Sequence, residues 1–486
     1  MADLTLTLDY RSETPLYEQL CRFVIGEMRA GRLKEGEKLP SKRALCEHLR
    51  ISRSTVEAAY EILAAEGYVE ARPRSGYYVR AALTLEPAPP ERAQNLKPAG
   101  QSGGTKSSRP APPSPARLYD FSTGDVDTAA FPYASWARIN REVVQTMPEL
   151  LKLGDAQGDP ELRQALTDFL REYRGVKCEP EQIVLGAGVE YLLDLLIRIM
   201  DPDASFALED PGYGGIYRAV RAAGREFHAI PLDGEGLVAA ALNASGARLA
   251  FVTPSHQFPT GLTMPAGRRA QLIRWAQGAP GRYVIEDDYD SEFRHTTRPI
   301  PAMQGMDGER VVYLGTFSRT IAPSIRASYM VLPESLMKAY RERLGRPNCT
   351  LSRFEQQTLR LFIERGLYAR HLRRAGGLYR RRRNLLIELF SPYPSMRLSG
   401  DDAGLHFLMT VDALPESALI TRAAAAGVKV RGLSEYTCKA QVPPSTLVIG
   451  YAGLSEEDIR QASALLIEAW GLDASKPISD AGRADL

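Results

Sequence analysis

Short apolar strands alternate with amphipathic helices through most of the chain, from about residue 119 to residue 471. The strand candidates are Ile183–Leu185, Ser205–Glu209, Leu249–Val252, Tyr283–Glu286, Val311–Leu314 and Ala327–Leu332. Helices follow most of them, and this alternation is typical of α/β domains, because parallel strands need crossover connections. From about Arg382 to Trp470 the pattern changes to an α+β segment. The body of the protein is therefore predicted to be α/β with a mainly parallel sheet.

Polar residues follow two of the predicted strands at the point where each strand ends. The strand Val311–Leu314 runs into Gly315-Thr316-Phe317-Ser318-Arg319, and the strand Tyr283–Glu286 runs into Asp287 and Tyr289. Open α/β sheets bind their ligands outside the carboxyl ends of the strands. Asp287 and Tyr289 are two residues apart and so share one face of a strand end. We expect a reactive or anion-binding site at this edge of the sheet.

Length and composition set the broad class of protein. A chain of 486 residues predicts two or three domains, and 44% hydrophobic with 25% charged residues is typical of soluble globular proteins. No apolar run reaches the length of a membrane span, and no signal peptide is visible. The five cysteines have no metal-ligand spacing, which predicts reduced thiols, no metal site and a cytoplasmic location. The net charge of +2 argues neither for nor against nucleic acid.

Residues 1–80 read as a small separate domain, or head. A helix is predicted over residues 15–30, with Thr14 as a possible cap, and two more begin at Ser41 and Ser52. Residues 68–79 form two short alternating segments around a turn, which predicts a β-hairpin. Three helices followed by a hairpin is the plan of a winged helix-turn-helix, whose third helix enters the major groove of DNA.

The basic and hydroxyl groups of this head fall on the elements that would face DNA. They lie at the starts of the second and third helices and along the hairpin, where they can reach phosphates and base edges. The candidate DNA-binding residues are Ser41, Arg43, Ser52, Arg53, Ser54, Thr55, Arg72, Arg74 and Gly76. The alternative is a three-helix scaffold with an ordinary charged surface, because acids nearly balance bases over residues 1–80.

Residues 81–117 are rich in Pro, Ala, Gly and Ser and offer no periodic apolar face. Such a composition cannot bury a core, so we expect an extended linker that lets the head reorient relative to the body. The predicted organisation is a head at 1–80, a linker at 81–117, a body at 118–475 and a tail at 476–486. If the body dimerises, two heads could reach separated half-sites on double-stranded DNA.

Specific motifs relate both parts to known families. The head resembles the GntR-type winged helix through Leu39-Pro40-Ser41-x-Arg43, Ser52-Arg53-Ser54-Thr55-Val56, Glu66-Gly67-Tyr68 and Arg72-x-x-Ser75-Gly76. The body resembles type I aminotransferases through Gly158-Asp159-Pro160, Glu209-Asp210-Pro211-Gly212-Tyr213, Thr253-Pro254-Ser255-His256-Gln257-Phe258-Pro259, Glu286-Asp287-Asp288-Tyr289 and Gly315-Thr316-Phe317-Ser318. The two together are similar to the MocR/GabR class of transcription regulators. That resemblance implies a head-to-tail homodimer and a small-molecule effector.

The resemblance also implies where pyridoxal phosphate would bind. Asp287 matches the residue that meets the pyridine nitrogen, Tyr289 the donor to the ring hydroxyl, and Arg326 the arginine that binds the phosphate. The candidate cofactor- or effector-binding residues are Gly188, Tyr213, Asp287, Tyr289, Ser318, Arg319 and Arg326. In the head, the residues matching Arg43, Arg53 and Thr55 touch DNA in that family.

Four features depart from the aminotransferase pattern. One is that no arginine occurs from Thr437 to Gly453, where many members of that family place the arginine that binds a substrate carboxylate. The other three are single positions. Arg319 stands where the family has the lysine that forms the internal aldimine, and a guanidinium stays charged and is a poor nucleophile. Leu153 stands where a tyrosine hydroxyl reaches the neighbouring subunit's phosphate. Glu190 places a carboxylate near the expected phosphate site, which is unfavourable for an anion. Any binding of pyridoxal phosphate is therefore expected to be non-covalent.

The favoured hypothesis is a DNA-binding transcription regulator whose inactive aminotransferase-like body dimerises and senses a small ligand. That ligand is pyridoxal phosphate or a related vitamer, or the pocket has drifted to another small anion or to a structural role. The alternatives are an aminotransferase with an accessory DNA-binding domain, and a scaffold that senses nothing. The arginine-rich stretch at 370–383 fits a solvated or interface helix, with a second DNA-backbone contact as the alternative.

Overall fold

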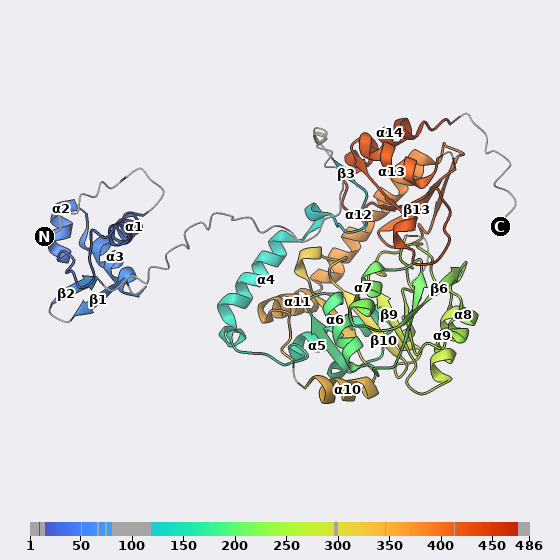
Figure 1. The fold of residues 1–486 in the computed structure, drawn as a ribbon, viewed down its shortest axis with the longest axis horizontal. Coiled ribbons are helices and arrows are strands. Elements are labelled where there is room, and N and C mark those ends of the chain that lie inside the picture. Colours follow the sequence, from blue (N-terminus) through green and yellow to red (C-terminus); the bar gives the residue numbers. More distant parts are fainter. Residues whose placement is uncertain are drawn as a thin grey trace, which may run out of the picture. The chain divides into compact units, whose positions relative to one another are not determined.

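The computed structural model describes Asp9, residues 15–79 apart from 50, 66–67 and 73–74, and residues 118–474 apart from 296–299, 346 and 413. The predicted linker at 81–117, the tail at 476–486 and the predicted cap Thr14 lie outside this range. The chain divides into two compact units, Met1–Pro110 and Ala111–Leu486 (Figure 1). These units are called the head and the body below.

The head has the predicted winged helix-turn-helix order. Its elements are α1 (Leu16–Arg29), α2 (Lys42–Leu49), α3 (Arg53–Ala65), β1 (Val69–Arg72) and β2 (Gly76–Val79), with the two strands paired antiparallel. The Ser41 hydroxyl accepts a hydrogen bond from the Ala44 N–H at 3.2 Å, and the Ser52 hydroxyl accepts one from the Thr55 N–H at 3.2 Å. Both hydroxyls cap the helices that follow them.

A sheet of eight strands forms the centre of the body within the described residues, in the order β4-β11-β10-β9-β8-β5-β6-β7. The strands are β4 (Ile183–Gly186), β5 (Phe206–Asp210), β6 (Phe227–Asp233), β7 (Gly236–Leu237), β8 (Leu249–Val252), β9 (Tyr283–Asp288), β10 (Val311–Thr316) and β11 (Ser328–Val331). Only β11 and the short β7 run against the others. The mainly parallel α/β sheet is confirmed. All six predicted strands are present, and β6 and β7 were not predicted.

Both faces of this sheet are buried, which explains why its strands are apolar without alternation. Val312 and Leu314 of β10 pack in one hydrophobic cluster, whereas Val311 and Tyr313 belong to clusters on the opposite face. The helices between and around the strands are α5 (Pro160–Arg174), α6 (Val189–Ile199), α7 (Gly214–Ala222), α8 (Ala239–Ala244), α9 (Ala266–Gln277), α10 (Glu334–Leu344) and α11 (Arg353–Glu364). These layers fix the strand ends at which the candidate site lies.

The C-terminal part of the body is α+β, as predicted. The long helix α12 (Leu367–Phe390) leads into the sheet β12-β13-β16-β15 and the helices α13 (Glu416–Ala425) and α14 (Glu456–Trp470) (Figure 1). The strands are β12 (Met396–Ser399), β13 (His406–Val411), β15 (Arg431–Gly432) and β16 (Thr446–Gly450). The first described strand of the body, β3 (Tyr119–Asp120), pairs with β14 (Val428–Lys429) and precedes α4 (Tyr133–Thr146).

The arginine-rich stretch lies within α12. Buried Arg382 donates to the Asp127 carboxylate and to the Ala452 carbonyl, and Arg381 pairs with Glu456 at 3.1 Å. Arginines 370, 373, 374 and 380 are exposed. This arrangement fits a partly solvated helix with structural ion pairs, while the second DNA contact stays a prediction.

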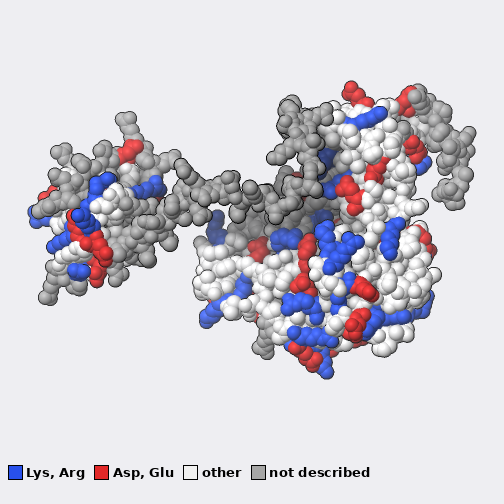
Figure 2. Space-filling model, viewed as in Figure 1, with Lys and Arg blue, Asp and Glu red and all other residues white. Residues whose placement is uncertain are grey.

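Acidic and basic side chains are interspersed over the visible face of the body (Figure 2). None of the described helices has the length and hydropathy needed to cross a membrane.

Candidate ligand pocket and DNA-binding surface

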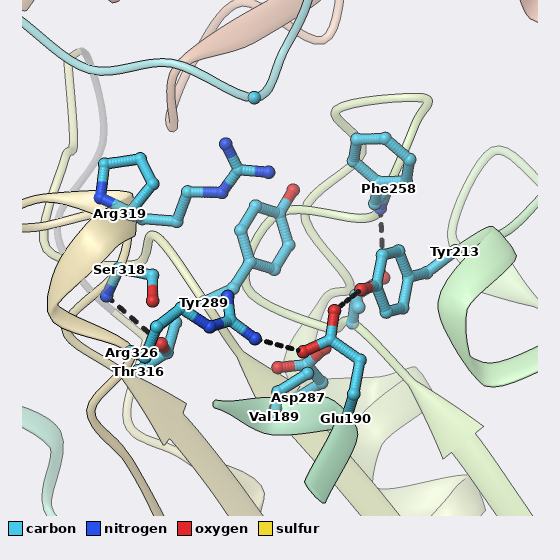
Figure 3. Close-up of a pocket in the computed structure, with 13 residues that line it drawn as sticks. Val189, Glu190, Tyr213, Phe258, Asp287, Tyr289, Thr316, Ser318, Arg319 and Arg326 are labelled. Atoms are coloured by element: carbon cyan, nitrogen blue, oxygen red, sulfur yellow. Dashed lines mark hydrogen bonds and ion pairs between the residues drawn. The ribbon is translucent and has the colours of Figure 1, made fainter. Parts of the chain in front are cut away.

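A cavity of about 170 Å³ lies beyond the carboxyl ends of β9 and β10 (Figure 3). Its walls come from these strand ends, the start of α6, the loops after β5 and β8, and the segments that contain Gly124 and Arg326. Six of the seven predicted effector-binding residues line it: Tyr213, Asp287, Tyr289, Ser318, Arg319 and Arg326. The seventh, Gly188, lies directly behind the Arg326 guanidinium. The residues predicted at the strand ends therefore lie together around one pocket.

Asp287 is the buried acid of the pocket. It lies near the end of β9, opposite Leu314 of β10, and is only 5% exposed. Burial, followed by the charges of Asp288 and Asp290, raises its pKa to about 8. Its Oδ1 atom has no hydrogen-bond partner among the described residues. A buried acceptor of this kind is costly unless a ligand supplies a donor or a positive charge.

Tyr289 is held by a buried pair that sequence reasoning did not assign. The Tyr289 hydroxyl donates to the His256 carbonyl at 2.9 Å and lies 3.1 Å from His256 Nδ1. His256 Nδ1 is in turn 2.9 Å from the Asp290 carboxylate, and both side chains are buried. These residues lie within the motifs that identify the body, but their partnership across 34 residues leaves no local signal. They fix the orientation of the Tyr289 ring at the pocket wall.

Arg326 pairs with a carboxylate inside the pocket. Its backbone is left-handed, with φ of 50°, which is a strained conformation for a residue with a side chain. Its guanidinium forms an ion pair of 2.8 Å with Glu190, whose other oxygen accepts a hydrogen bond from the Tyr213 hydroxyl at 3.2 Å (Figure 3). Burial raises the Glu190 pKa, but the backbone N–H and Arg326 outweigh it, so the pKa is lowered. Glu190 is therefore charged at neutral pH.

Arg319 extends across the pocket beside Tyr289 (Figure 3). Its guanidinium donates to the backbone carbonyl of Thr123, in the segment between β3 and α4. The neighbouring Ser318 hydroxyl is buried and has no partner within the described part of the chain. Both arginines of the pocket thus have acceptors within the protein. Asp287 Oδ1 and Ser318 Oγ, in contrast, have no hydrogen-bond partner among the described residues.

A buried ion network supports the floor of the pocket. Asp288 accepts from Arg174 at 2.7 Å and from the Tyr313 hydroxyl at 2.6 Å. Burial raises the Asp288 pKa, but Arg174 and Tyr313 outweigh it, and the net pKa is lowered. Adjacent residues on β9 therefore have opposite electrostatics. Asp288 is stabilised as a carboxylate, whereas Asp287 is not.

These residues fit one end of pyridoxal phosphate better than the other. The Asp287 carboxyl, whose Oδ1 has no partner among the described residues, and the rings of Tyr213, Phe258 and Tyr289 suit a protonated pyridine ring. At the phosphate end, Arg326 is paired with Glu190, and a Cβ at Gly188 would overlap the Arg326 guanidinium. The side chain at 319 is a guanidinium, which lacks a nucleophilic amine. The ring fits this pocket, whereas the phosphate meets a carboxylate.

The candidate DNA-binding residues are mostly exposed on the head. The side chains of Arg43 and Arg53 are 90% and 79% exposed and form ion pairs with acids one turn later on their helices. The Ser52 hydroxyl lies 2.8 Å from that of Ser54 and 2.7 Å from that of Thr55.

Residues of the wing complete this predicted surface. The Arg72 guanidinium lies 4.4 Å from the ring centre of Tyr78, and Gly76 has a φ of 116° that favours glycine. Arg74 lies outside the described residues. The exposed basic side chains are placed where the winged-helix plan needs them, and their contacts with DNA remain predictions.

Comparisons with known proteins match both units. Residues 16–79 match the family of bacterial regulatory proteins, gntR family, and residues 116–466 match aminotransferase class I and II. Among solved structures, the multiple substrate aminotransferase of Thermococcus profundus is 24% identical with a TM-score of 0.66, covering 74% of this chain and 92% of that one. At that identity the likeness establishes the aminotransferase fold of the body.

Relatives that match over nearly their whole length are named as transcriptional regulators or regulatory proteins. YdeL of Bacillus subtilis is 38% identical over 474 residues, which covers 96% of this chain and 99% of that protein. The pyridoxine biosynthesis regulator PdxR of Corynebacterium glutamicum is 33% identical over 475 residues, covering 97% and 100%. MocR of Rhizobium meliloti is 33% identical over 470 residues, covering 94% of each. The chain therefore belongs to the MocR family of DNA-binding transcriptional regulators, in which a GntR-type head is fused to an aminotransferase-like body.

Proposed function

We propose that this regulator senses a pyridine-type ligand that its body binds without a covalent bond, and that it is not an enzyme. One observation carries the proposal. The pocket keeps Asp287 as a buried acceptor whose Oδ1 has no partner in the described chain, while the side chain at position 319, just after the end of β10, is a guanidinium. The first feature favours binding of a protonated ring nitrogen. The second leaves no amine at 319 to form an imine with an aldehyde.

The chemistry of Arg319 argues against transaminase activity, which is the competing function. An imine requires a neutral primary amine, and a guanidinium is protonated at every physiological pH. Protein mixed with pyridoxal phosphate and reduced with borohydride should show no adduct at position 319 by peptide mass spectrometry. Arg319→Lys should gain the adduct and its near-ultraviolet absorbance. An adduct on Arg319 of the wild-type protein would refute the proposal.

The identity of the ligand is proposed from the pocket and from one relative. PdxR is named as a regulator of pyridoxine biosynthesis, and Asp287 with its aromatic neighbours suits a pyridinium ring. Pyridoxine and its relatives should therefore raise the melting temperature of the wild-type protein, because a ligand that binds only the folded state stabilises it. Asp287→Asn should abolish that shift.

We also propose that the chain forms the head-to-tail homodimer expected of the family, through contacts of its body. Large apolar side chains are exposed on and after α4: Tyr133, Val144, Leu151 and Leu153 are 62%, 57%, 81% and 84% exposed. Such a concentration of exposed apolar side chains favours a protein interface. Leu153 is the residue for which the family pattern has a tyrosine directed at the neighbouring subunit.

The role of the head in DNA binding is tested with matched arginine variants. Arg53 lies at the start of α3 and Arg22 lies on α1, and each forms an i,i+4 ion pair on the surface of its helix. Arg53→Ala should weaken binding to DNA fragments selected by the wild-type chain, and should reduce the slope of log affinity against log salt by about one per contact. Arg22→Ala should leave both unchanged. Equal behaviour of the two variants would contradict the assignment of α3.

A further inference from the structure

We propose that Glu190 makes this pocket select pyridine-type ligands that carry no phosphate, by occupying the anion-binding position with a carboxylate of the protein itself. The inference rests on the proposed ligand-sensing function and specifies the class of ligand. It follows from the difference between the two ends of the pocket. The end near Asp287 suits a pyridinium ring, whereas the end near Arg326 and Glu190 does not suit a phosphate.

The first step is the geometry of Glu190. One carboxylate oxygen accepts from Arg326 Nη2 at 2.8 Å, and the other accepts from the Tyr213 hydroxyl at 3.2 Å (Figure 3). One internal anion therefore accepts hydrogen bonds from both Arg326, the arginine expected to bind a phosphate, and the Tyr213 hydroxyl. Glu190 lies in the first turn of α6, where the backbone N–H groups also favour a negative charge.

The second step is that Arg326 has little freedom to serve a further anion. Its left-handed backbone is fixed at the end of a short 3-10 turn, residues Pro323–Ile325. Its guanidinium lies so close to Gly188 that even a Cβ there would overlap it. The guanidinium is thus held between the Gly188 backbone and the Glu190 carboxylate. A phosphate placed against Arg326 would lie beside that carboxylate and be repelled by it.

The third step is that the second cation of the pocket is also engaged. The Arg319 guanidinium donates to the Thr123 carbonyl. The ionisable side chains lining the pocket are Arg319, Arg326, Glu190 and Asp287, so the charged Glu190 lowers by one the positive charge that a phosphate with two negative charges would meet. The polar atoms that lack partners in the described chain are Asp287 Oδ1 and Ser318 Oγ. Asp287 Oδ1 calls for a donor on the ligand, and a ring N–H supplies one.

The matched probes are pyridoxine and pyridoxine 5′-phosphate, which differ only in the phosphate and have no aldehyde to react with lysines. Binding to the full chain is measured by isothermal titration calorimetry for wild type and for Glu190→Gln, in which the amide replaces the charge at nearly constant volume. Wild type should bind pyridoxine at least about tenfold more tightly than its phosphate, and Glu190→Gln should shift the ratio at least about tenfold toward the phosphate.

Asp194→Asn is the control, because Asp194 is an exposed carboxylate on the same helix, paired with Arg198 and outside the pocket. It should leave the ratio unchanged. Glu190 is half exposed, so folding should survive, and Glu190→Ala gives a second variant with the same expected direction. Preference of wild type for the phosphate, or an unchanged ratio in both Glu190 variants, would overturn this inference alone. Failure of wild type to bind either compound would refute the proposed ligand and this inference with it.

Discussion

Replacing Asp287 by asparagine should stabilise the ligand-free protein while removing its affinity for the ligand. Burial and the charges of Asp288 and Asp290 raise the Asp287 pKa from 3.8 to about 8. A carboxyl whose pKa is higher in the folded state takes up a proton on folding. The free energy of unfolding therefore falls as pH rises from about 4, where the carboxyl of the unfolded chain ionises, to about 8. Asparagine cannot ionise and does not incur this loss.

The size of the effect follows from the shift. One pKa unit corresponds to about 1.36 kcal/mol, so a shift of about four units gives an upper limit of about 5 kcal/mol above pH 8 and about 4 kcal/mol at pH 7. Solvent screens the Asp287 charge only slightly, because the residue is only 5% exposed. The free energy of unfolding, measured by urea titration, should therefore favour Asp287→Asn by about 2 kcal/mol at pH 5 and by about 5 kcal/mol at pH 8.5.

The adjacent acid provides the matched control. Asp288 pairs with buried Arg174 at 2.7 Å and its pKa is lowered, so its charge is stabilising. Asp288→Asn should destabilise the body by about 3–5 kcal/mol, because the Arg174 charge is left buried without its partner. The reasoning would be refuted if both variants were destabilised alike, or if the gain in Asp287→Asn did not grow with pH.

Three further variants test other parts of the structure. Gly188→Ala forces a side chain into a φ of 98° and against Arg326, so we expect a loss of about 1–3 kcal/mol in thermal unfolding and weaker ligand binding; an unchanged affinity would contradict the described packing. Arg382→Met leaves the mostly buried Asp127 unpaired and should cost about 3–5 kcal/mol in urea unfolding, although the helix keeps its other arginines. Val144→Glu, on the exposed face of α4, should convert the proposed dimer to monomers in analytical ultracentrifugation, and a persistent dimer would place the interface elsewhere.

The sequence predicted the sheet well because its strands carry strong local signals. The runs around Val284 and Val312 are β-branched and buried on both faces, so no alternation obscures them. The strand β6 escaped prediction because it lies toward the edge of the sheet, has a mixed burial pattern and contains Pro231. The two-residue spacing of Asp287 and Tyr289 likewise placed both at the pocket, as a strand end requires.

The electrostatic state of the pocket was not predictable to the same degree. Glu190 and Arg326 are 136 residues apart in the chain, and Arg319 and Thr123 are 196 apart. The sequence indicated that a carboxylate at Glu190 would disfavour a phosphate. Only the fold shows that this carboxylate pairs with Arg326, the arginine that was predicted to bind a phosphate. Long-range pairs of this kind depend on the tertiary packing, which no local pattern encodes.

The most direct test of the account measures DNA affinity of the full chain with and without a saturating pyridine-type ligand. DNA fragments are first selected from a random library by the wild-type protein, and affinities are then compared for wild type and Asp287→Asn with pyridoxine present or absent. The account predicts a change of at least about fivefold in wild type, in the range typical of coupled sites, and none in the variant. Equal DNA affinities of the wild-type protein with and without bound ligand would contradict the claim that ligand binding to the body controls DNA binding by the head.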